Sequence, residues 1–143
     1  RAVKRPTFSG SEKTASADMR QLRQELADLV LASDYGLDVR GDANESTRLY
    51  EILSLGRIPV ILDTERNLPF RDVVRYEDFS LIVDFRDIKR LPERIADFHR
   101  SLSSEKFVEM QDAARKAFVE HFRTDAHMRH IVRQLRERGA IAQ

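Results

Sequence analysis

The chain has no cysteine and no tryptophan, and it has only 5 glycines and 4 prolines among its 143 residues. The absence of cysteine excludes a disulfide framework, a thiolate zinc site, an iron–sulfur cluster and a cysteine nucleophile. Hydrophobic residues make up 41% of the sequence. Length and composition together indicate one ordinary soluble globular unit, since domains commonly hold about 100 to 150 residues.

The chain also lacks an excess of charge, because 25 Lys and Arg face 24 Asp and Glu for a net charge of +1. The two signs are interleaved, whereas a nucleic-acid binder would show a positive surplus or a one-signed run, so we expect no nucleic-acid partner. No apolar run reaches the roughly 18 residues of a membrane span, and residues 1–20 lack the apolar core of a signal peptide. We therefore expect a cytoplasmic protein.

Four arginines near the end of the chain could attract an anionic membrane surface: Arg129, Arg133, Arg136 and Arg138. Acidic residues lie among and beside them, at Asp125 and Glu137, which favours a solvated helix face. Peripheral contact with the inner membrane is left open.

Along the chain, segments whose apolar residues have helical spacing alternate with short apolar segments typical of strands. It predicts helices over 18–32 and 46–55, strands over 35–39, 57–62 and 79–83, and only helices after residue 87. Residues 1–17 form a basic, then polar lead-in with a short strand at 6–9. This order predicts an α/β core with a parallel sheet over 18–101, and C-terminal helices over 102–143 that pack on it as a tail.

Several polar residues are placed to cap helices. Asp18 and either Ser103 or Ser104 precede helical segments, as does Thr124, and Gly56 suits the turn after a helix end. Three strand-end aspartates, Asp63, Asp84 and Asp87, are candidates for a general base or a cap. We favour capping for Asp87.

The most informative segment is the polar loop at 40–45 and the helix start that follows it. Such a junction lies at the carboxyl end of a sheet strand, where α/β folds bind ligands and free helix amides suit a phosphate. Arg48 lies in the first turn, where the helix dipole disfavours a cation unless it binds an anion. Glu51 shares its face and suits a ribose diol, so the two would bind a nucleotide diphosphate. A simple ion pair on a solvated face is an equally good interpretation.

Several ordered motifs extend this segment: Arg40-Gly41, Asn44, Ser46, Arg48-Leu49-Tyr50-Glu51, Gly56, Ile58-Pro59-Val60, Leu68-Pro69-Phe70, Phe79-Ser80 and Asp87-Ile88. Over about residues 18–122 the sequence resembles the exostosin family of glycosyltransferases, in particular its bacterial members. The resemblance implies the C-terminal half of a GT-B fold, a Rossmann-like domain that holds a nucleotide-sugar donor without an obligatory metal or other cofactor. It also implies transfer of the sugar, from a UDP-sugar in our interpretation, to a glycan or lipid-linked acceptor in polysaccharide biosynthesis.

Site residues follow from the resemblance position by position. Arg48 would neutralise the donor diphosphate and Glu51 would bind the ribose, while Arg40, Gly41, Asn44, Ser46 and Thr47 would surround the phosphates. Leu68, Pro69 and Phe70 would lie at the sugar or cleft rim. Stabilising the departing diphosphate is the electrostatic part of such a reaction.

The sequence also departs from the family pattern. Arg57 stands where many members have cysteine, and we expect it to face out of the core. An acceptor-binding N-terminal GT-B domain should precede residue 1 and supply the catalytic base, so no base is named. The segment between Ser9 and Asp18 is short for the family. The alternative function is a non-catalytic nucleotide-binding or interaction module derived from such an enzyme.

All four histidines fall in the helical region after residue 87. His121, His127 and His130 could begin a metal site, but no carboxylate or cysteine completes a recognisable ligand set. We therefore expect them on helix surfaces, with no metal.

Overall fold

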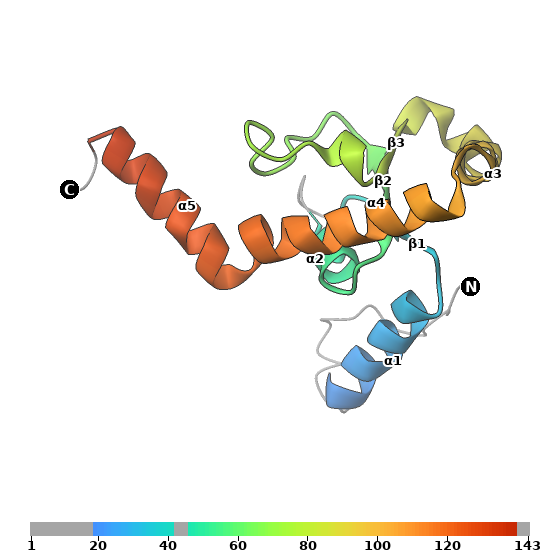
Figure 1. The fold of residues 1–143 in the computed structure, drawn as a ribbon, viewed down its shortest axis with the longest axis horizontal. Coiled ribbons are helices and arrows are strands. Elements are labelled where there is room, and N and C mark those ends of the chain that lie inside the picture. Colours follow the sequence, from blue (N-terminus) through green and yellow to red (C-terminus); the bar gives the residue numbers. More distant parts are fainter. Residues whose placement is uncertain (1–18, 42–45, 140–143) are drawn as a thin grey trace.

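A computed structural model describes residues 19–41 and 46–139 of the chain. These residues contain a three-stranded parallel sheet in the order β1-β2-β3, flanked by helices (Figure 1). The strands are β1 (Tyr35–Asp38), β2 (Ile58–Asp63) and β3 (Leu81–Asp84). The predicted α/β fold, a Rossmann-like parallel sheet followed by C-terminal helices, is confirmed. The division into lead-in, core and tail stays a prediction.

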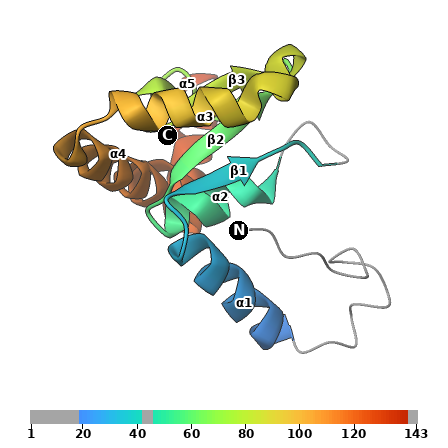
Figure 2. The same cartoon turned by 90° about the vertical axis from the view of Figure 1, so that its right-hand side faces the viewer.

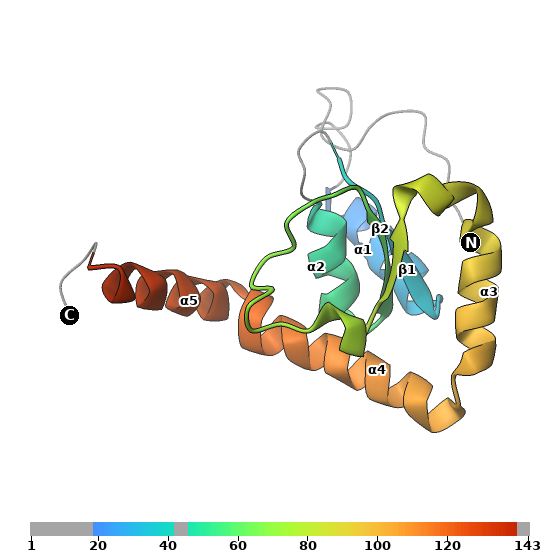
Figure 3. The same ribbon diagram turned by 90° about the horizontal axis from the view of Figure 1, so that it is seen from above.

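Helices cover both faces of this sheet. They are α1 (Met19–Leu31), α2 (Thr47–Ser54), α3 (Leu91–Ser101), α4 (Ser104–Ala117) and α5 (Thr124–Glu137). Helices α2 and α3 lie on opposite sides of the strands, and α4 runs past one end of the layers (Figure 3). Helix α1 projects from the body, with the sheet near its C-terminal end only (Figure 2). Short turns of 3-10 helix at Tyr76–Asp78 (η1) and Phe85–Arg90 (η2) and a π-helical turn at Phe118–Phe122 (η3) complete the order.

The core forms where α2 meets the sheet. Strand β2 lies between its two neighbours and is buried from residue 58 to 62, as expected for a central parallel strand covered on both faces. Helix α2 turns Leu49, Ile52 and Leu53 toward it, as its spacing predicts. Gly36 of β1 permits this approach, because a Cβ there would lie 2.4 Å from Ile52 Cγ1.

The predicted strands are present with shifted ends. The strand predicted over 35–39 is one residue longer than β1 at its end, and the strand predicted over 57–62 is shifted by one residue from β2 at both ends. The strand predicted from residue 79 begins only at Leu81. Phe79 and Ser80 are buried beside it, and the Ser80 hydroxyl donates to the Tyr76 carbonyl at 2.6 Å. The two residues fit the pattern of a strand because they are buried, although they do not pair with another strand. The strand predicted at 6–9 and the Asp18 cap lie outside the described residues.

Two predicted caps are wrong and one is confirmed. The Ser103 hydroxyl accepts from the Lys106 amide at 3.1 Å and caps α4. Thr124 is instead the first residue of α5, because Arg123 occupies the cap position and binds the Asp125 carboxylate. Asp87 lies inside η2, which is capped by Asp84 through the Arg86 amide at 2.7 Å.

Arg57 links α1 to the body. Its side chain lies at the base of β2, where Nη2 donates to the Leu31 carbonyl at 2.9 Å and Nη1 to the Gly56 carbonyl at 3.3 Å. The Leu31 carbonyl belongs to the last residue of α1 and has no partner within that helix. Arg57 therefore satisfies a helix end as well as lying outside the apolar core.

Helix α5 extends away from the sheet and meets the rest of the chain near its start (Figures 1 and 3). Phe70 stacks on His130 with ring centroids 4.7 Å apart and contacts His127 edge-on at 4.8 Å. His130 Nε2 lies 3.0 Å from His121 Nδ1, and its Nδ1 lies 2.9 Å from Arg133 Nη2. Because a guanidinium only donates, neutral His130 carries its proton on Nε2 and donates it to His121.

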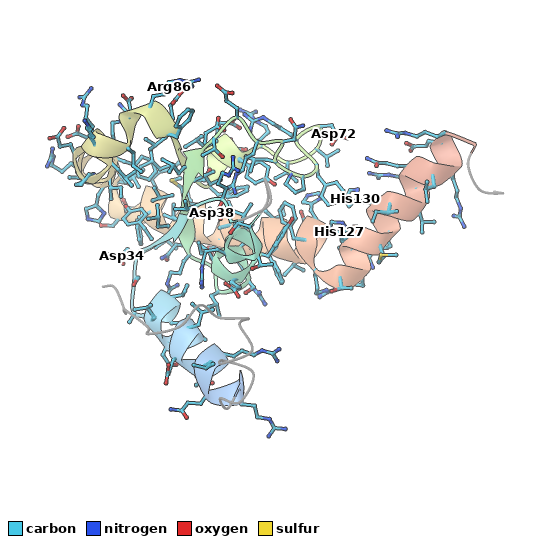
Figure 4. All side chains as sticks on the ribbon, turned by 180° about the vertical axis from the view of Figure 1, so that it is seen from behind. Asp34, Asp38, Asp72, Arg86, His127 and His130 are labelled. Carbon is cyan, nitrogen blue, oxygen red and sulfur yellow. The ribbon has the colours of Figure 1, made fainter. Side chains whose placement is uncertain are left out.

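We expect acid to weaken the packing of His130 of α5 against Phe70 and His121. Burial, then Arg133 and His121, lower the pKa of His130, with Asp72 opposing and His127 adding to the effect (Figure 4). A base with a lowered folded-state pKa contributes stability above its unfolded value, near 6.5, and loses it as the pH falls below that value. The thermal midpoint should therefore fall from pH 7 toward 5 more steeply in the parent than in His130→Gln. His99→Gln, on α3, should keep the parental slope; equal slopes in all three would contradict the expectation.

Candidate functional site

All three strands end in aspartate at one edge of the sheet, because parallel strands present their carboxyl ends together. Asp63 and Asp84 are partners in the register of β2 and β3. The Asp63 carboxylate accepts from the Glu65 amide at 2.9 Å, and Asp84 accepts from the Arg86 amide. Backbone hydrogen bonds occupy these two carboxylates, which stabilise the turns that leave the sheet.

Asp38, labelled in Figure 4, is fully buried at the end of β1. It pairs with Arg66 from the loop after β2. Arg66 Nη2 donates to Asp38 Oδ2. Burial lowers the pKa of the Arg66 guanidinium, and the nearby Tyr76 phenol opposes this shift. Two polar atoms of the pair, Asp38 Oδ1 and Arg66 Nε, are buried without a hydrogen-bond partner in the described part of the chain.

The start of α2 lies at the same edge, directly after the loop that leaves β1. Ser46 has extended backbone angles, and its hydroxyl accepts from the Arg48 amide at 3.2 Å. It is therefore the N-cap of a helix whose first turn contains no acidic residue. Thr47 begins the helix and is exposed. This end of α2 presents the partial positive charge that suits an anion.

Arg48 and Glu51 form the ion pair that their spacing allows. Arg48 Nη1 lies 2.9 Å from Glu51 Oε2, and the two side chains are 41% and 40% exposed. Nη1 is shielded from solvent but is not aligned with an acceptor as in a hydrogen bond. Such a half-exposed pair contributes about 0 to 1 kcal/mol, so a ligand can replace it at little cost.

A small hollow beside this helix start brings several predicted residues together. It is lined by Ser46, Leu49, Tyr50, Arg66, Asn67, Leu68 and Pro69. The hollow has about 200 Å³ of open space, its mouth included, and its inner part has room for about one water molecule. The loop residues predicted at the cleft rim, Leu68 and Pro69, thus lie against the helix start predicted to hold phosphate.

The other predicted residues are placed differently. Phe70 does not line the hollow; its backbone has a φ of 54°, and its ring packs on η3 and α5. Arg40 and Gly41 are exposed in the segment after β1. Asn44 lies outside the described residues. The roles of all these residues toward a donor stay predictions.

The tail histidines do not assemble a metal site. Within residues 19–41 and 46–139, no group of three or more His, Cys, Asp or Glu could hold a metal ion. In the same residues, no helix has the length and apolar content needed to span a bilayer.

Comparison with known proteins assigns the part of the chain that contains the sheet to a protein family. A family model described as the exostosin GT47 domain matches residues 4–98, about two thirds of the chain. The chain belongs to this family. As a member of the exostosin GT47 family, it is related to glycosyltransferases, and the match includes the sheet, α2 and every predicted donor-binding residue.

Two curated relatives agree with the family. One, from Arabidopsis thaliana and named a probable glycosyltransferase, is 44% identical over 62 residues, which are 43% of this chain and 12% of the relative. An exostosin-1 homolog from Caenorhabditis elegans is 28% identical over 109 residues, which are 76% of this chain and 26% of the relative. The chain therefore spans about an eighth to a quarter of the length of these exostosin relatives.

Sequence reasoning missed the Asp38–Arg66 pair at this exostosin site. The residues are 28 positions apart, and neither belongs to a motif that points to the other. The available signal was weak: a carboxylate directly after an apolar strand and an arginine two residues before Leu68-Pro69-Phe70.

Proposed function

We propose that this chain is the donor-binding part of an exostosin-type glycosyltransferase, the C-terminal half of a GT-B fold, and that it binds a nucleotide-diphosphate sugar. A uridine diphosphate sugar is the favoured donor. The observation that carries the proposal is the start of α2 at the carboxyl edge of the sheet, with Arg48 and Glu51 on one half-exposed face.

The chemistry of this arrangement suits a nucleotide diphosphate. The helix amides and the Arg48 guanidinium offer positive charge to the diphosphate, and the dipole of α2 disfavours Arg48 where no anion is bound. The Glu51 carboxylate would repel a phosphate but accepts hydrogen bonds from a ribose diol. Binding would replace the Arg48–Glu51 contact by one donor contact at each side chain, so neither would be left without a partner.

In the proposed reaction this half stabilises the leaving diphosphate, whose negative charge grows as the sugar departs. No obligatory metal is proposed, because Arg48 and helix amides supply positive charge. The catalytic base would come from an N-terminal GT-B domain, and the acceptor would be a glycan or a lipid-linked saccharide. We place this reaction in bacterial polysaccharide biosynthesis in the cytoplasm. If the enzyme touches the inner membrane peripherally, the arginines of α5 would make the contact.

Calorimetric titration with uridine diphosphate tests the proposal. Binding should be measurable for the parent chain, and Arg48→Ala should weaken it by about 1.5 to 3 kcal/mol because a charged hydrogen bond is lost. That loss is roughly a 10- to 150-fold increase in Kd. Glu51→Gln should weaken binding of uridine diphosphate without weakening that of inorganic diphosphate, because it removes the partner of the ribose and also a negative charge beside the phosphates.

The matched control is Arg94→Ala, which removes an exposed arginine from α3 on the other side of the sheet. It should leave the affinity unchanged. If Arg48→Ala binds uridine diphosphate as the parent does, the ion pair is only a surface contact and the proposed role of Arg48 is wrong. Absence of binding by the parent chain would contradict the donor-binding function itself. Binding without sugar transfer, even with an N-terminal half supplied, would favour a non-catalytic module.

A further inference from the structure

Helix α5 joins the preceding helical segment through a single non-helical residue. Arg123 has a φ of −58° and a ψ of 139°, and it separates the π-helical turn η3 from α5. Beyond it, α5 extends away from the sheet, and only its start lies beside other elements (Figures 1 and 3). A residue at the end of an element is where a hinge absorbs changes in backbone angle. The side-chain contacts near the start of α5 therefore fix its direction.

These contacts include two hydrogen bonds that run in one direction from α5 to η3. Arg133 Nη2 lies 2.9 Å from His130 Nδ1, and His130 Nε2 lies 3.0 Å from His121 Nδ1. Because a guanidinium only donates, His130 Nδ1 is an acceptor and its proton lies on Nε2. His121 Nδ1 is then the acceptor of the second hydrogen bond. Both members of this histidine pair, His121 and His130, are therefore neutral.

The histidine pair cannot take up a proton without losing a hydrogen bond. A proton on His130 Nδ1 would face the donating N–H group of Arg133, and a proton on His121 Nδ1 would face the Nε2–H of His130. Reversing the bond between the two rings does not remove the conflict, because His130 would then carry its own proton on Nδ1, opposite Arg133. Each protonated form thus opens a contact that ties α5 to η3 or to its own next turn.

The charged and titratable groups around the pair come from three elements: Asp72 in the loop between β2 and η1, Glu120 in η3, and His127 and Arg133 in α5 (Figure 4). The two acidic groups favour a charged imidazole, as does the Phe70 ring that stacks on His130. Burial, followed by Arg133, outweighs Asp72, and the pKa of His130 is lowered. Proton uptake by His130 therefore belongs below about pH 6.5.

We propose that the histidine pair is a pH-sensitive contact that holds α5 in its observed direction, and that protonation of the pair frees α5 to turn about Arg123 while the sheet stays folded. The contact also borders the candidate site. Phe70 stacks on His130 and directly follows Leu68 and Pro69, which line the hollow beside α2. The inference does not depend on the proposed function, and the titration with uridine diphosphate does not bear on it.

A distance measurement tests the proposal, because a chain without cysteine accepts two spin labels at chosen positions. Arg94→Cys on α3 and Arg136→Cys on α5 provide exposed labelling sites. Double electron–electron resonance should give one narrow distance distribution at pH 8. A second population should grow as the pH falls from 6.5 to 5, with the circular dichroism of the protein unchanged. A distribution that is constant from pH 8 to 5 overturns the proposal, as does a change that coincides with loss of circular dichroism.

Variants of the labelled chain identify the groups responsible. His121→Gln/His130→Gln removes both titrating rings, so its distance distribution should be the same at pH 8 and pH 5, whichever direction α5 takes. The matched control, His99→Gln/His127→Gln, also removes two histidines and should keep the parental transition. A transition that persists in the first variant or disappears in the second would assign the movement to other groups.

A second measurement needs no substitution in the histidine pair. Long-range proton–nitrogen NMR spectra should show both imidazoles as Nε2–H tautomers at pH 8. As the pH falls, protonation of the pair should have the same midpoint as the growth of the second distance population. A different tautomer of His130, or two midpoints that do not coincide, contradicts the proposal even if the double variant does not fold.

Discussion

Asp38→Asn will lower the free energy of unfolding by about 3 to 5 kcal/mol, because it removes one partner of a buried ion pair and leaves the Arg66 charge uncompensated. Neither side chain can reach solvent without moving the end of β1 or the loop after β2. Urea unfolding followed by circular dichroism measures the change.

Two control variants sharpen this result. Asp84→Asn changes another strand-end aspartate whose side chain is 53% exposed, so it should cost much less than Asp38→Asn. Asp38→Leu/Arg66→Met replaces both charges with apolar groups and should recover most of the lost stability. Equal costs for Asp38→Asn and Asp84→Asn would mean that the pair is not buried as described.

Ile52→Ala will destabilise the domain by about 2 to 5 kcal/mol, because Ile52 is fully buried between α2 and β1. Gly36→Ala should also be destabilising, by about 1 to 3 kcal/mol, because its Cβ would lie between 2.4 and 2.9 Å from three side-chain carbons of Ile52. Both values come from chemical unfolding of the single variants.

The combination should reverse the sign of the glycine substitution. All three atoms that crowd a Cβ at residue 36 belong to the Ile52 side chain beyond its own Cβ, and Ile52→Ala removes them. In that background Gly36→Ala should be stabilising, since the new methyl group fills part of the cavity. Additive costs would show that Gly36 is required for its backbone rather than for the space it leaves.

This contact matters for the candidate site because α2 carries both the core and the ligand face. Leu49, Ile52 and Leu53 hold the helix against the sheet. The opposite side of the same two turns presents Arg48 and Glu51. Variants at residue 36 or 52 that shift α2 should therefore weaken donor binding indirectly, whereas Arg48 variants should do so without loss of stability.

The local sequence pattern was sufficient to predict those elements whose structure depends mainly on their own residues. The apolar run after Gly56 predicted β2, and the three-to-four spacing of Leu49, Ile52 and Leu53 predicted the buried face of α2. A serine cap at residue 103 or 104 followed from hydroxyl chemistry, and the structure selects Ser103. Prediction was less accurate at Phe79 and Ser80, where burial under a 3-10 turn produces the same apolar signal as a strand.

Caps at turns were the other weak point. Asp84 and Asp87 have the same chemistry and lie three residues apart, and the backbone after β3 decides which one caps. At the start of α5, Arg123 occupies the cap position with a φ of −58° and a ψ of 139°, and Thr124 is already helical. Both outcomes depend on backbone angles that single-sequence spacing does not encode.

The sequence by itself determined the α/β class, the ordered exostosin motifs and the Arg48–Glu51 face, because each can be read from the residue spacing within single segments and from the order of those segments along the chain. Only the tertiary structure decided that Arg66 returns to Asp38, and that Phe70 joins the histidines of α5 and not the hollow with Leu68 and Pro69. These contacts join residues far apart in the chain. Each of these residues contacts the charge or ring that lies nearest to it in the folded protein. Which group lies nearest depends on tertiary packing and not on local spacing in the sequence.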